Sequence, residues 1–559
     1  MNKTNKLSLI VLFLAILVGA FFRFYKLGVT PRGFYLDEAA MGYDAYSVLK
    51  TGKDEFGMPY PIIFRSFLDF KTPIDTYLII PLIPLMDLTP FSVRFPSALF
   101  GVLTLPLLYF LLKKLTSDPD VPLVATIFLA ISPWHIIFSR TAYETNIALF
   151  FLLLGTYLFL SAIKRPWFFV VSAVSFAISF TAYHAERIVV PALVLSLAVY
   201  FFKDILQNFK NVAIPAVISI LIGLILVLPT VKLMKTPGFL SRATTLNIFS
   251  YKNQMPWGYK KGNTNIEKIL NTPQLLSIKE FGALYTSYFS PRYLFSIGDS
   301  GPRSSYPDFG TFFWWQFPLY LVGLYVLIKE IENKELKVFI LALLFASPIP
   351  AALTRDPYST IRSLPMVIPL IIIMSLGAIK IYQTNFFSKS KITSYLLVLI
   401  LVASCTKFYI SVFHFNDYFR SQHWDFGWKP VTDAIKELED PNLPILVDNS
   451  RGEAYIHLLF FLKFDPDTYQ NSNFEVPLTE YYTNMTRNLT KNMGKITVKN
   501  LEWGNDTMFK EQYIIADGMA VSEQQAKDHN MTILDEFIFP NRDVAFRILK
   551  TNPKKNKYN

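Results

Sequence analysis

Residues 28–75 read GVTPRGFYLDEAAMGYDAYSVLKTGKDEFGMPYPIIFRSFLDFKTPID and follow directly on an apolar segment. The stretch is rich in aromatic residues, turn formers and acids. The acids are Asp37, Glu38, Asp44, Asp54, Glu55, Asp69 and Asp75. In a chain that is 52% hydrophobic, a polar loop of this kind is where chemistry can take place. Two of its carboxylates are adjacent in sequence and lie just beyond the first apolar helix, so we expect this loop to organise the functional site.

The composition indicates a polytopic membrane protein. The 559 residues have a mean hydropathy of +0.32, and long apolar runs alternate with charged residues. The net charge of +12 would suit nucleic-acid binding, but the basic residues cluster at the ends of apolar runs, which favours a role in membrane orientation. With Cys405 as the single cysteine, no intrachain disulfide can form. The N-terminal segment is expected to be an uncleaved helix, because it has no small-residue cleavage site.

A spanning helix needs about 20 mostly apolar residues. Eleven segments are predicted to span: 7–27, 91–112, 121–139, 147–163, 166–183, 188–202, 211–230, 311–328, 338–354, 363–380 and 392–412. With a cytoplasmic N-terminus, the lysines and arginines of the short loops fall on the cytoplasmic side. Residues 28–75, 231–310 and 414–559 are then expected outside the plasma membrane. Residues 73–88 are short and proline-containing, and are expected to lie at the outer interface without crossing.

The composition changes near residue 414, where the apolar runs shorten. Segments such as PILVDN, KITVKN and EQYIIAD are typical of strands, and residues 531–551 predict a terminal hairpin. The predicted fold is therefore an α-helical polytopic membrane protein with about eleven transmembrane helices and a small C-terminal α/β domain outside the membrane. We expect a transmembrane domain over residues 1–413 and the α/β domain over residues 414–559.

Three acids of the expected outer loops can be weighed for chemistry. Asp37 and Glu38 could be solvated loop residues, but a carboxylate enclosed by apolar elements can also serve as a general base for a hydroxyl group. Glu144, in SRTAYETN, lies in a short outer turn. It could form a local ion pair with Arg140, or it could face the first loop across a cavity. Glu55, later in the first loop, is expected to be an ordinary acidic surface residue.

The basic candidates lie at predicted outer helix ends. Arg355 and Arg362, in TRDPYSTIRSLP, could reach towards lipid headgroups or form a guanidinium clamp on a phosphate. Lys71 could be a further phosphate partner. His184, in HAER, could anchor the interface or contact a substrate. The six histidines show no metal-ligand spacing, and nucleotide-binding and hydrolase motifs are absent from the sequence.

Four elements together carry a family resemblance. They are YLDEAA (35–40), KTPID (71–75), VRFPSALFGVLTLPLLYFLLKKL (93–115) and IRSLPMVIP (361–369). Over residues 7–412 the chain resembles the GT-C glycosyltransferases of the protein O-mannosyltransferase and lipid A aminoarabinose-transferase type. In KTPID, Ile74 replaces the second proline of the pattern that these families often have.

The resemblance implies a polyprenyl-phosphate sugar donor and inverting transfer to a hydroxyl acceptor on a lipid, glycan or protein at the extracytoplasmic face. It implies that Asp37 is the base and Glu38 its supporting acid, and it matches Glu144 to an acid of the second outer loop. A divalent metal is neither required nor excluded by the sequence. The alternatives are a transporter or lipid flippase, and an outer sensor or scaffold. A transporter is expected to carry charges near mid-membrane and repeated halves, whereas the charges here lie at helix ends.

Overall fold

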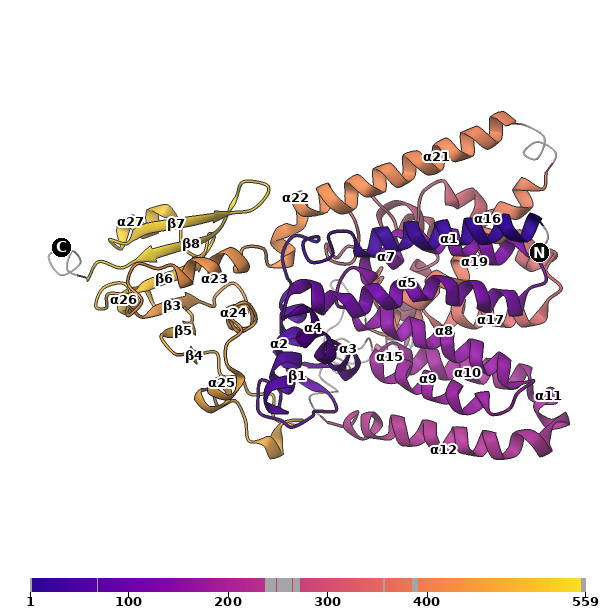
Figure 1. Cartoon of the computed structure of the whole chain (residues 1–559), viewed down its shortest axis with the longest axis horizontal. Coiled ribbons are helices and arrows are strands. Elements are labelled where there is room, and N and C mark those ends of the chain that lie inside the picture. Colours follow the sequence, from indigo (N-terminus) through magenta and orange to yellow (C-terminus); the bar gives the residue numbers. More distant parts are fainter. Residues whose placement is uncertain are drawn as a thin grey trace. The chain divides into compact units, whose positions relative to one another are not determined.

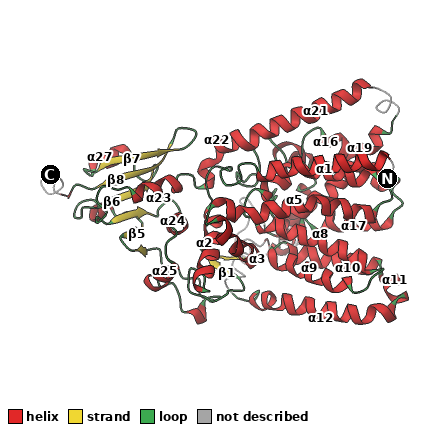
Figure 2. Ribbon diagram, in the orientation of Figure 1, coloured by secondary structure: helices red, strands yellow, loops and turns green. Residues whose placement is uncertain are grey.

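The computed structural model describes residues 3–67, 69–236, 248, 264, 272–354, 357–384 and 391–553. The chain divides into two compact units (Figures 1 and 2). The helical unit comprises residues 1–25 and 96–411, and the α/β unit comprises residues 26–95 and 412–559. The boundary predicted near residue 413 divides the chain into two consecutive parts. In the structure the first loop belongs to the same unit as the C-terminal region.

The helical unit consists of apolar helices, which are red in Figure 2. Its described elements are α1 (Lys3–Phe24), α5 (Pro90–Leu115, whose first residues belong to the α/β unit), α6 (Asp120–Ala130), α7 (Pro133–Ser139), α8 (Glu144–Ala162), α9 (Phe168–Ala182), α10 (Glu186–Tyr200), α11 (Phe202–Gln207), α12 (Phe209–Leu233), α15 (Pro273–Ser287), η3 (Arg292–Ile297), α16 (Gln316–Lys329), α17 (Lys334–Ala346), α18 (Ile349–Leu353), η4 (Leu364–Met366), α19 (Val367–Tyr382) and α21 (Lys391–Ile410). Each of the eleven ranges predicted to span falls on these helices. Among them, 121–139 covers α6 and α7, 338–354 covers α17 and α18, and 363–380 covers η4 and α19.

Several of these helices can cross a membrane by length and composition. Within the described residues there are six, or seven when α6 and α7, which meet at 58°, are counted as one broken span. The predicted spans on α1, α9 and α16 correspond to shorter apolar helices, and α10 has 15 residues. The protein is a multi-pass membrane protein, and the number eleven stays a prediction.

Close helix packing sets the orientation of α8 and α9. The Ser179 hydroxyl donates to the Ala148 carbonyl at 2.9 Å, and the Ser172 hydroxyl donates to the Gly155 carbonyl at 2.8 Å. Higher residue numbers on α9 thus face lower numbers on α8, so the two helices are antiparallel. The start of α8 and the end of α9 lie at one end of the helical unit, and the turn at residues 163–167 lies at the opposite end.

The α/β unit contains a sheet and the helices around it. Its described elements are α2 (Leu36–Thr51), β1 (Phe64–Ser66), β2 (Asp69–Lys71), α3 (Pro73–Ile79), η1 (Ile80–Leu82), α4 (Ile83–Met86), α22 (Asn416–Arg420), η6 (Ser421–Trp424), α23 (Trp428–Lys436), β3 (Ile445–Asp448), α24 (Ala454–Leu462), α25 (Pro466–Ser472), η7 (Leu478–Glu480), β4 (Lys491–Met493), β5 (Ile496–Lys499), α26 (Trp503–Asp506), β6 (Tyr513–Asp517), α27 (Glu523–Asp528), β7 (Thr532–Ile538) and β8 (Val544–Lys550). Helix η5 (Ser411–Phe415) begins at the unit boundary.

The sheet has the strand order β4-β5-β3-β6-β8-β7. Strand β3 pairs in parallel with β5 and β6, and the remaining pairs are antiparallel. The three predicted strand segments form β3, β5 and β6, and the predicted terminal hairpin forms β7 and β8. Leu446, Ile514 and Leu549 are buried in one apolar cluster on the sheet, so the strands share a core. The small C-terminal α/β region predicted from the sequence is confirmed.

Within the α/β unit, hydrogen bonds join the first loop to the C-terminal region. The Tyr43 hydroxyl donates to the Phe464 carbonyl at 3.0 Å, and the Arg65 guanidinium donates to the Tyr481 carbonyl at 3.1 Å. Such a folded unit cannot lie across a bilayer, because the backbone N–H and C=O groups of its irregular segments would lack hydrogen-bond partners in the hydrocarbon. Both segments must therefore lie on the same side of the membrane. An even number of crossings between residues 95 and 412 is required, and the ten predicted there meet this condition.

Cysteine labelling tests this arrangement. In a Cys405→Ser background, Lys53→Cys and Ser472→Cys, both at exposed positions of the α/β unit, should react with a membrane-impermeant maleimide in intact cells. Lys203→Cys, exposed at the predicted cytoplasmic end of the helical unit, should react only after permeabilisation. Labelling of Lys53→Cys and Ser472→Cys from opposite sides would contradict the shared location of the two segments.

Candidate active site

The two adjacent acids lie in the first turn of α2. Tyr35 precedes the helix in an extended conformation, and its backbone N–H donates to Glu38 Oε2 at 3.3 Å. The unsatisfied N–H groups at a helix N-terminus favour negative charge, so two acids in the first turn stabilise the start of α2. The helix ends at Gly52, whose φ of 72° is the left-handed conformation that glycine adopts without strain. The YLDEAA element thus positions Asp37 and Glu38 at the N-terminus of a regular helix.

Glu38 is held by a buried arginine. Nε and Nη2 of Arg94, near the start of α5, donate to the two carboxylate oxygens of Glu38, each at 2.8 Å. The exposed fraction is 0% for Arg94 and 3% for Glu38. The other guanidinium N–H groups donate to the carbonyl oxygens of Leu27, Pro31 and Gly33. Since all five donors of the guanidinium are used, the pair fixes the start of α2 against α5.

Asp37 is in a different environment. Its Oδ1 lies 2.8 Å from Lys71 Nζ, and the side chains of Asp37 and Lys71 are 23% and 11% exposed. Lys71 is the last residue of β2, which pairs with β1 in a short antiparallel hairpin. Oδ2 of Asp37 is hydrogen-bonded to none of the residues that the structure describes. Asp37 therefore has one anchored oxygen and one oxygen available to a substrate.

The predicted site residues divide between the two units. Asp37, Glu38 and Lys71 come together in the α/β unit, and Glu144, His184 and Arg362 lie in the helical unit. Arg355 lies outside the described residues. Lys71, expected to be a phosphate partner, contacts the predicted base itself.

In the helical unit Glu144 is the first residue of α8 and is 9% exposed. The hydroxyl of the next residue, Thr145, donates to the Ile361 carbonyl at 3.1 Å, which brings the start of α8 beside the segment that carries Arg362. Arg362 Nη1 donates to the Thr354 hydroxyl at 3.0 Å. The acid and the arginine predicted from separate motifs therefore belong to neighbouring segments.

His184 follows α9 at the same end of the helical unit, because α8 and α9 are antiparallel. Its Nδ1 lies 2.6 Å from Arg187 Nη1 in the same HAER element. The antiparallel packing therefore gathers Glu144, His184 and Arg362 at one end of the unit.

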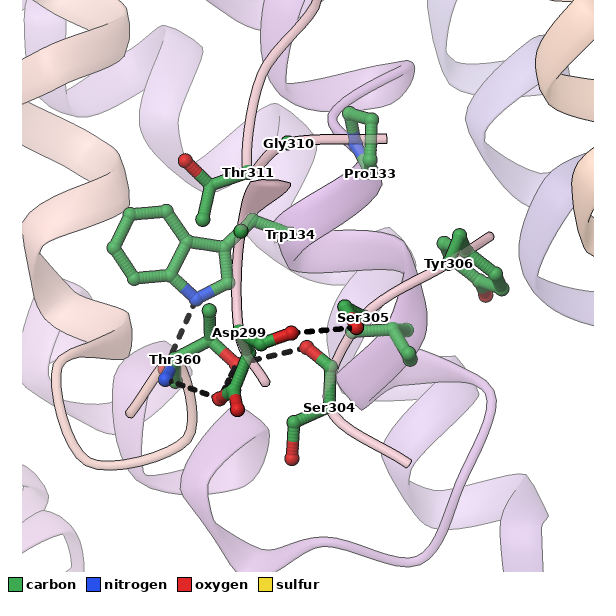
Figure 3. A pocket seen from close by; sticks show the side chains of 11 residues that line it. Pro133, Trp134, Asp299, Ser304, Ser305, Tyr306, Gly310, Thr311 and Thr360 are labelled. Atoms are coloured by element: carbon green, nitrogen blue, oxygen red, sulfur yellow. Dashed lines mark hydrogen bonds between the residues drawn. The ribbon is translucent and has the colours of Figure 1, made fainter. Parts of the chain in front are cut away.

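Hydrogen bonds beside a small cavity hold the loop before Arg362 in place (Figure 3). Thr360 donates through its N–H and its hydroxyl to Asp299 Oδ2, each at 2.7 Å, and Trp134 Nε1 donates to the Thr360 carbonyl at 2.9 Å. The cavity volume is about 10 Å³, room for about one water and far too little for a sugar. These contacts give the loop a structural anchor.

Arg94 was missed as a site residue by sequence reasoning. A signal was present, because Arg94 is the arginine of RFPSALFG, the element used there only as a mark of resemblance. Its role depends on Glu38, 56 residues earlier in the chain, and no local pattern reports that partner.

The expectation that Glu55 is a surface acid is wrong. Glu55 is 2% exposed and lies with Asp54 and Asp44 in a buried cluster. The Tyr455 hydroxyl donates to Glu55 Oε1 at 3.3 Å, the Tyr481 hydroxyl donates to Asp54 Oδ2, and the Glu55 N–H donates to Asp44 Oδ1 at 3.1 Å. Burial raises the pKa of Glu55 to about 8 and that of Asp54 to about 6. The cluster is a buried polar network of the α/β unit.

A metal site would need several ligand side chains close together among the described residues. Among those residues no three His, Cys, Asp or Glu side chains come together in a way that could hold a metal ion.

Comparison with known proteins adds independent findings. The family model for dolichyl-phosphate-mannose-protein mannosyltransferase matches residues 71–232. The structure of ArnT from Cupriavidus metallidurans bound to undecaprenyl phosphate matches with a TM-score of 0.51 at 10% identity and covers 98% of both chains. Archaeal oligosaccharyltransferase AglB from Archaeoglobus fulgidus, in complex with an inhibitory peptide and a dolichol-phosphate, matches with a TM-score of 0.49 at 13% identity over 82% of this chain. Among curated proteins none matches the sequence.

The match to ArnT extends over nearly the whole chain and shows that the two proteins share a fold. Together with the family-model match over residues 71–232, this shared fold confirms the predicted resemblance to GT-C glycosyltransferases. This chain spans 64% of the length of the archaeal oligosaccharyltransferase. The family-model match begins at Lys71 and includes Arg94 and Glu144, whereas Asp37 and Glu38 precede it.

The Glu38–Arg94 pair gives a stability prediction. Arg94→Met should lower the free energy of unfolding by about 3–5 kcal/mol, because it leaves the Glu38 carboxylate buried without its charge partner. Adding Glu38→Gln should recover part of that loss. Lys463→Met is the control, since Lys463 pairs with Asp87 at the surface and such pairs contribute about 0–1 kcal/mol. Denaturation in mild detergent gives the free energy of unfolding of the wild type, Arg94→Met, Glu38→Gln, the double variant and the control. Losses in the double variant equal to the sum of the two single losses would contradict the coupling.

The buried acids give a pH prediction. The folded-state pKa of Glu55, about 8, lies above its ordinary value of 4.5, so between these pH values the folded protein keeps a proton that the unfolded chain has released. Stability should fall as pH rises through this window. Thermal unfolding should occur at a lower temperature at pH 8 than at pH 6. Glu55→Gln should reduce this temperature difference, and Asp44 and Asp54 should account for the difference that remains in the variant. If the unfolding temperature changed equally with pH in the wild type and in Glu55→Gln, the buried Glu55 would not be the source of the pH dependence.

Proposed function

We propose that this protein is a membrane glycosyltransferase that moves a sugar, a hexose or a pentose, from a polyprenyl-phosphate donor to a hydroxyl acceptor on a lipid, glycan or protein. The reaction inverts the anomeric carbon and takes place at the extracytoplasmic face. The observation that carries the proposal is the unequal environment of two adjacent carboxylates, one locked by arginine and one accessible. The full-length fold match to ArnT, a protein whose structure contains undecaprenyl phosphate, supports it.

Asp37 is the general base in this proposal. Its accessible oxygen accepts the proton of the acceptor hydroxyl while the hydroxyl oxygen attacks the anomeric carbon from the face opposite the phosphate. The bond between the anomeric carbon and the phosphate oxygen breaks, and polyprenyl phosphate leaves with the electron pair. Lys71 keeps Asp37 oriented through the other oxygen and places a positive charge beside the reacting groups.

Glu38 is a positioning residue. Both of its oxygens receive hydrogen bonds from Arg94, and Oε2 also accepts the Tyr35 N–H, so the side chain is held in place. Its contribution is to fix the first turn of α2, and with it the direction in which Asp37 projects. A displacement of about 1 Å at a catalytic group can cost about a hundredfold in rate, so this support matters for turnover.

The donor phosphate is proposed to be bound by arginine. Arg362 has the planar guanidinium that suits phosphate, and its Nη1 contact to Thr354 sets its direction. Arg355, seven residues earlier, is proposed as its partner from the sequence alone. Glu144 and His184, at the same end of the helical unit, are proposed to contact the substrates. A polyprenyl chain would remain in the lipid beside the apolar helices.

Replacement of the base is the direct test of this site. Asp37→Asn preserves the size of the side chain but cannot accept the proton. Turnover should fall about 10²–10⁴-fold, the usual contribution of general-base catalysis, with donor affinity nearly unchanged. The measurement is release of polyprenyl phosphate by purified protein at saturating donor.

Asp87→Asn is the matched control. Asp87 also pairs with a lysine in the α/β unit, Lys463, but its side chain is 63% exposed. This variant should keep near wild-type turnover. Near-normal turnover in Asp37→Asn under the same conditions would remove Asp37 from the proposed role.

A further inference from the structure

A second cavity lies at the opposite end of the helical unit from Glu144 and His184. Its volume is about 600 Å³, within the range of about 300–1,000 Å³ typical of ligand sites. Residues of α5, α8, α9 and α17 line it, together with the turn between α8 and α9 and the residue after α10. Figure 1 labels these helices in the helical unit. Four of the lining side chains are basic: Lys113, Lys114, Lys164 and Arg165.

The four cations of this cavity outnumber the acids of its lining within the part of the chain that the structure describes. No described carboxylate lies within ion-pair distance of any of the four cations. Lys114 Nζ instead lies 4.4 Å from the centre of the Tyr157 ring and donates to the Ser161 hydroxyl at 2.5 Å. Glu335, in the first turn of α17, is the one acid among the described residues of the lining. The neutral contacts to Tyr157 and Ser161 orient Lys114 and leave its charge to be balanced by an anion.

The surroundings of the cavity are aromatic and apolar. Phe168 and Phe201 line it. Beside them in sequence, Trp167 and Phe202 are 64% and 57% exposed, and Phe110, one turn before Lys113 on α5, is 52% exposed. Exposed aromatic side chains at the ends of apolar helices are typical of the membrane–water interface. An anion held here would have hydrocarbon next to it.

We propose that this cavity binds the phosphate of an anionic membrane phospholipid. Its cations contact the phosphate, and the acyl chains lie along the exposed aromatic and aliphatic side chains of the neighbouring helices. Basic pockets between transmembrane helices commonly bind anionic headgroups on the cytoplasmic side, and this is the end of the helices that the charge pattern predicts to be cytoplasmic. A free phosphate would use the cations but not the apolar rim. The site is separate from the proposed catalytic residues.

The test is lipid binding by the full-length protein. Purified, delipidated protein in a neutral detergent is titrated with phosphatidylglycerol or phosphatidylcholine, and bound lipid is counted by native mass spectrometry. Phosphatidylglycerol should bind and phosphatidylcholine should not. Lys164→Gln/Arg165→Gln should weaken binding about 25- to 30-fold, roughly fivefold for each basic side chain removed. Lys203→Gln/Lys210→Gln removes two exposed lysines outside the cavity and should leave the affinity unchanged.

A gain in affinity supplies a result that misfolding cannot imitate. Glu335→Gln removes the one lining carboxylate and should tighten phosphatidylglycerol binding several-fold. Unchanged binding in Lys164→Gln/Arg165→Gln, or an equal loss in the Lys203→Gln/Lys210→Gln control, would overturn the proposal. Occupation of the site by inorganic phosphate, with exclusion of the lipid, would also overturn it.

Discussion

The buried ion pair between Arg94 and Glu38 is the constraint on which the proposed active site depends. Taking two charges out of water is costly, and such a pair is tolerated when every hydrogen-bonding group is satisfied. Here the guanidinium meets both oxygens of Glu38 and three backbone carbonyls, so the start of α5, the start of α2 and the segment between α1 and α2 are joined at one point. These hydrogen bonds hold the first turn of α2 in one position.

Helix geometry then separates the roles of two neighbouring acids. Successive residues of an α-helix point about 100° apart, so Asp37 and Glu38 cannot share one environment. Glu38 faces the buried arginine, whereas Asp37 faces Lys71 and keeps an accessible oxygen. An adjacent acidic pair at the start of a helix can in this way supply one residue for support and one for chemistry.

Sequence reasoning succeeded where the signal was local. Long apolar runs located the helices, and β-branched runs located β3, β5 and β6. It failed where the partner was distant. Glu55 lies in a turn-like segment, and its burial depends on Tyr455, 400 residues later. The grouping of residues 26–95 with residues 412–559 likewise rests on contacts between the two ends of the chain, which no window of sequence can report.

The central claim is sugar transfer from a lipid phosphate. The most direct measurement incubates the purified wild-type protein with a panel of polyprenyl-phosphate sugars and hydroxyl acceptors and follows the release of polyprenyl phosphate. We expect release from at least one donor, dependent on an acceptor and accompanied by a glycosylated product of inverted anomeric configuration. Two results would contradict this function. In one, a folded protein that binds donor leaves every donor uncleaved. In the other, the protein moves a donor across a bilayer without cleaving it.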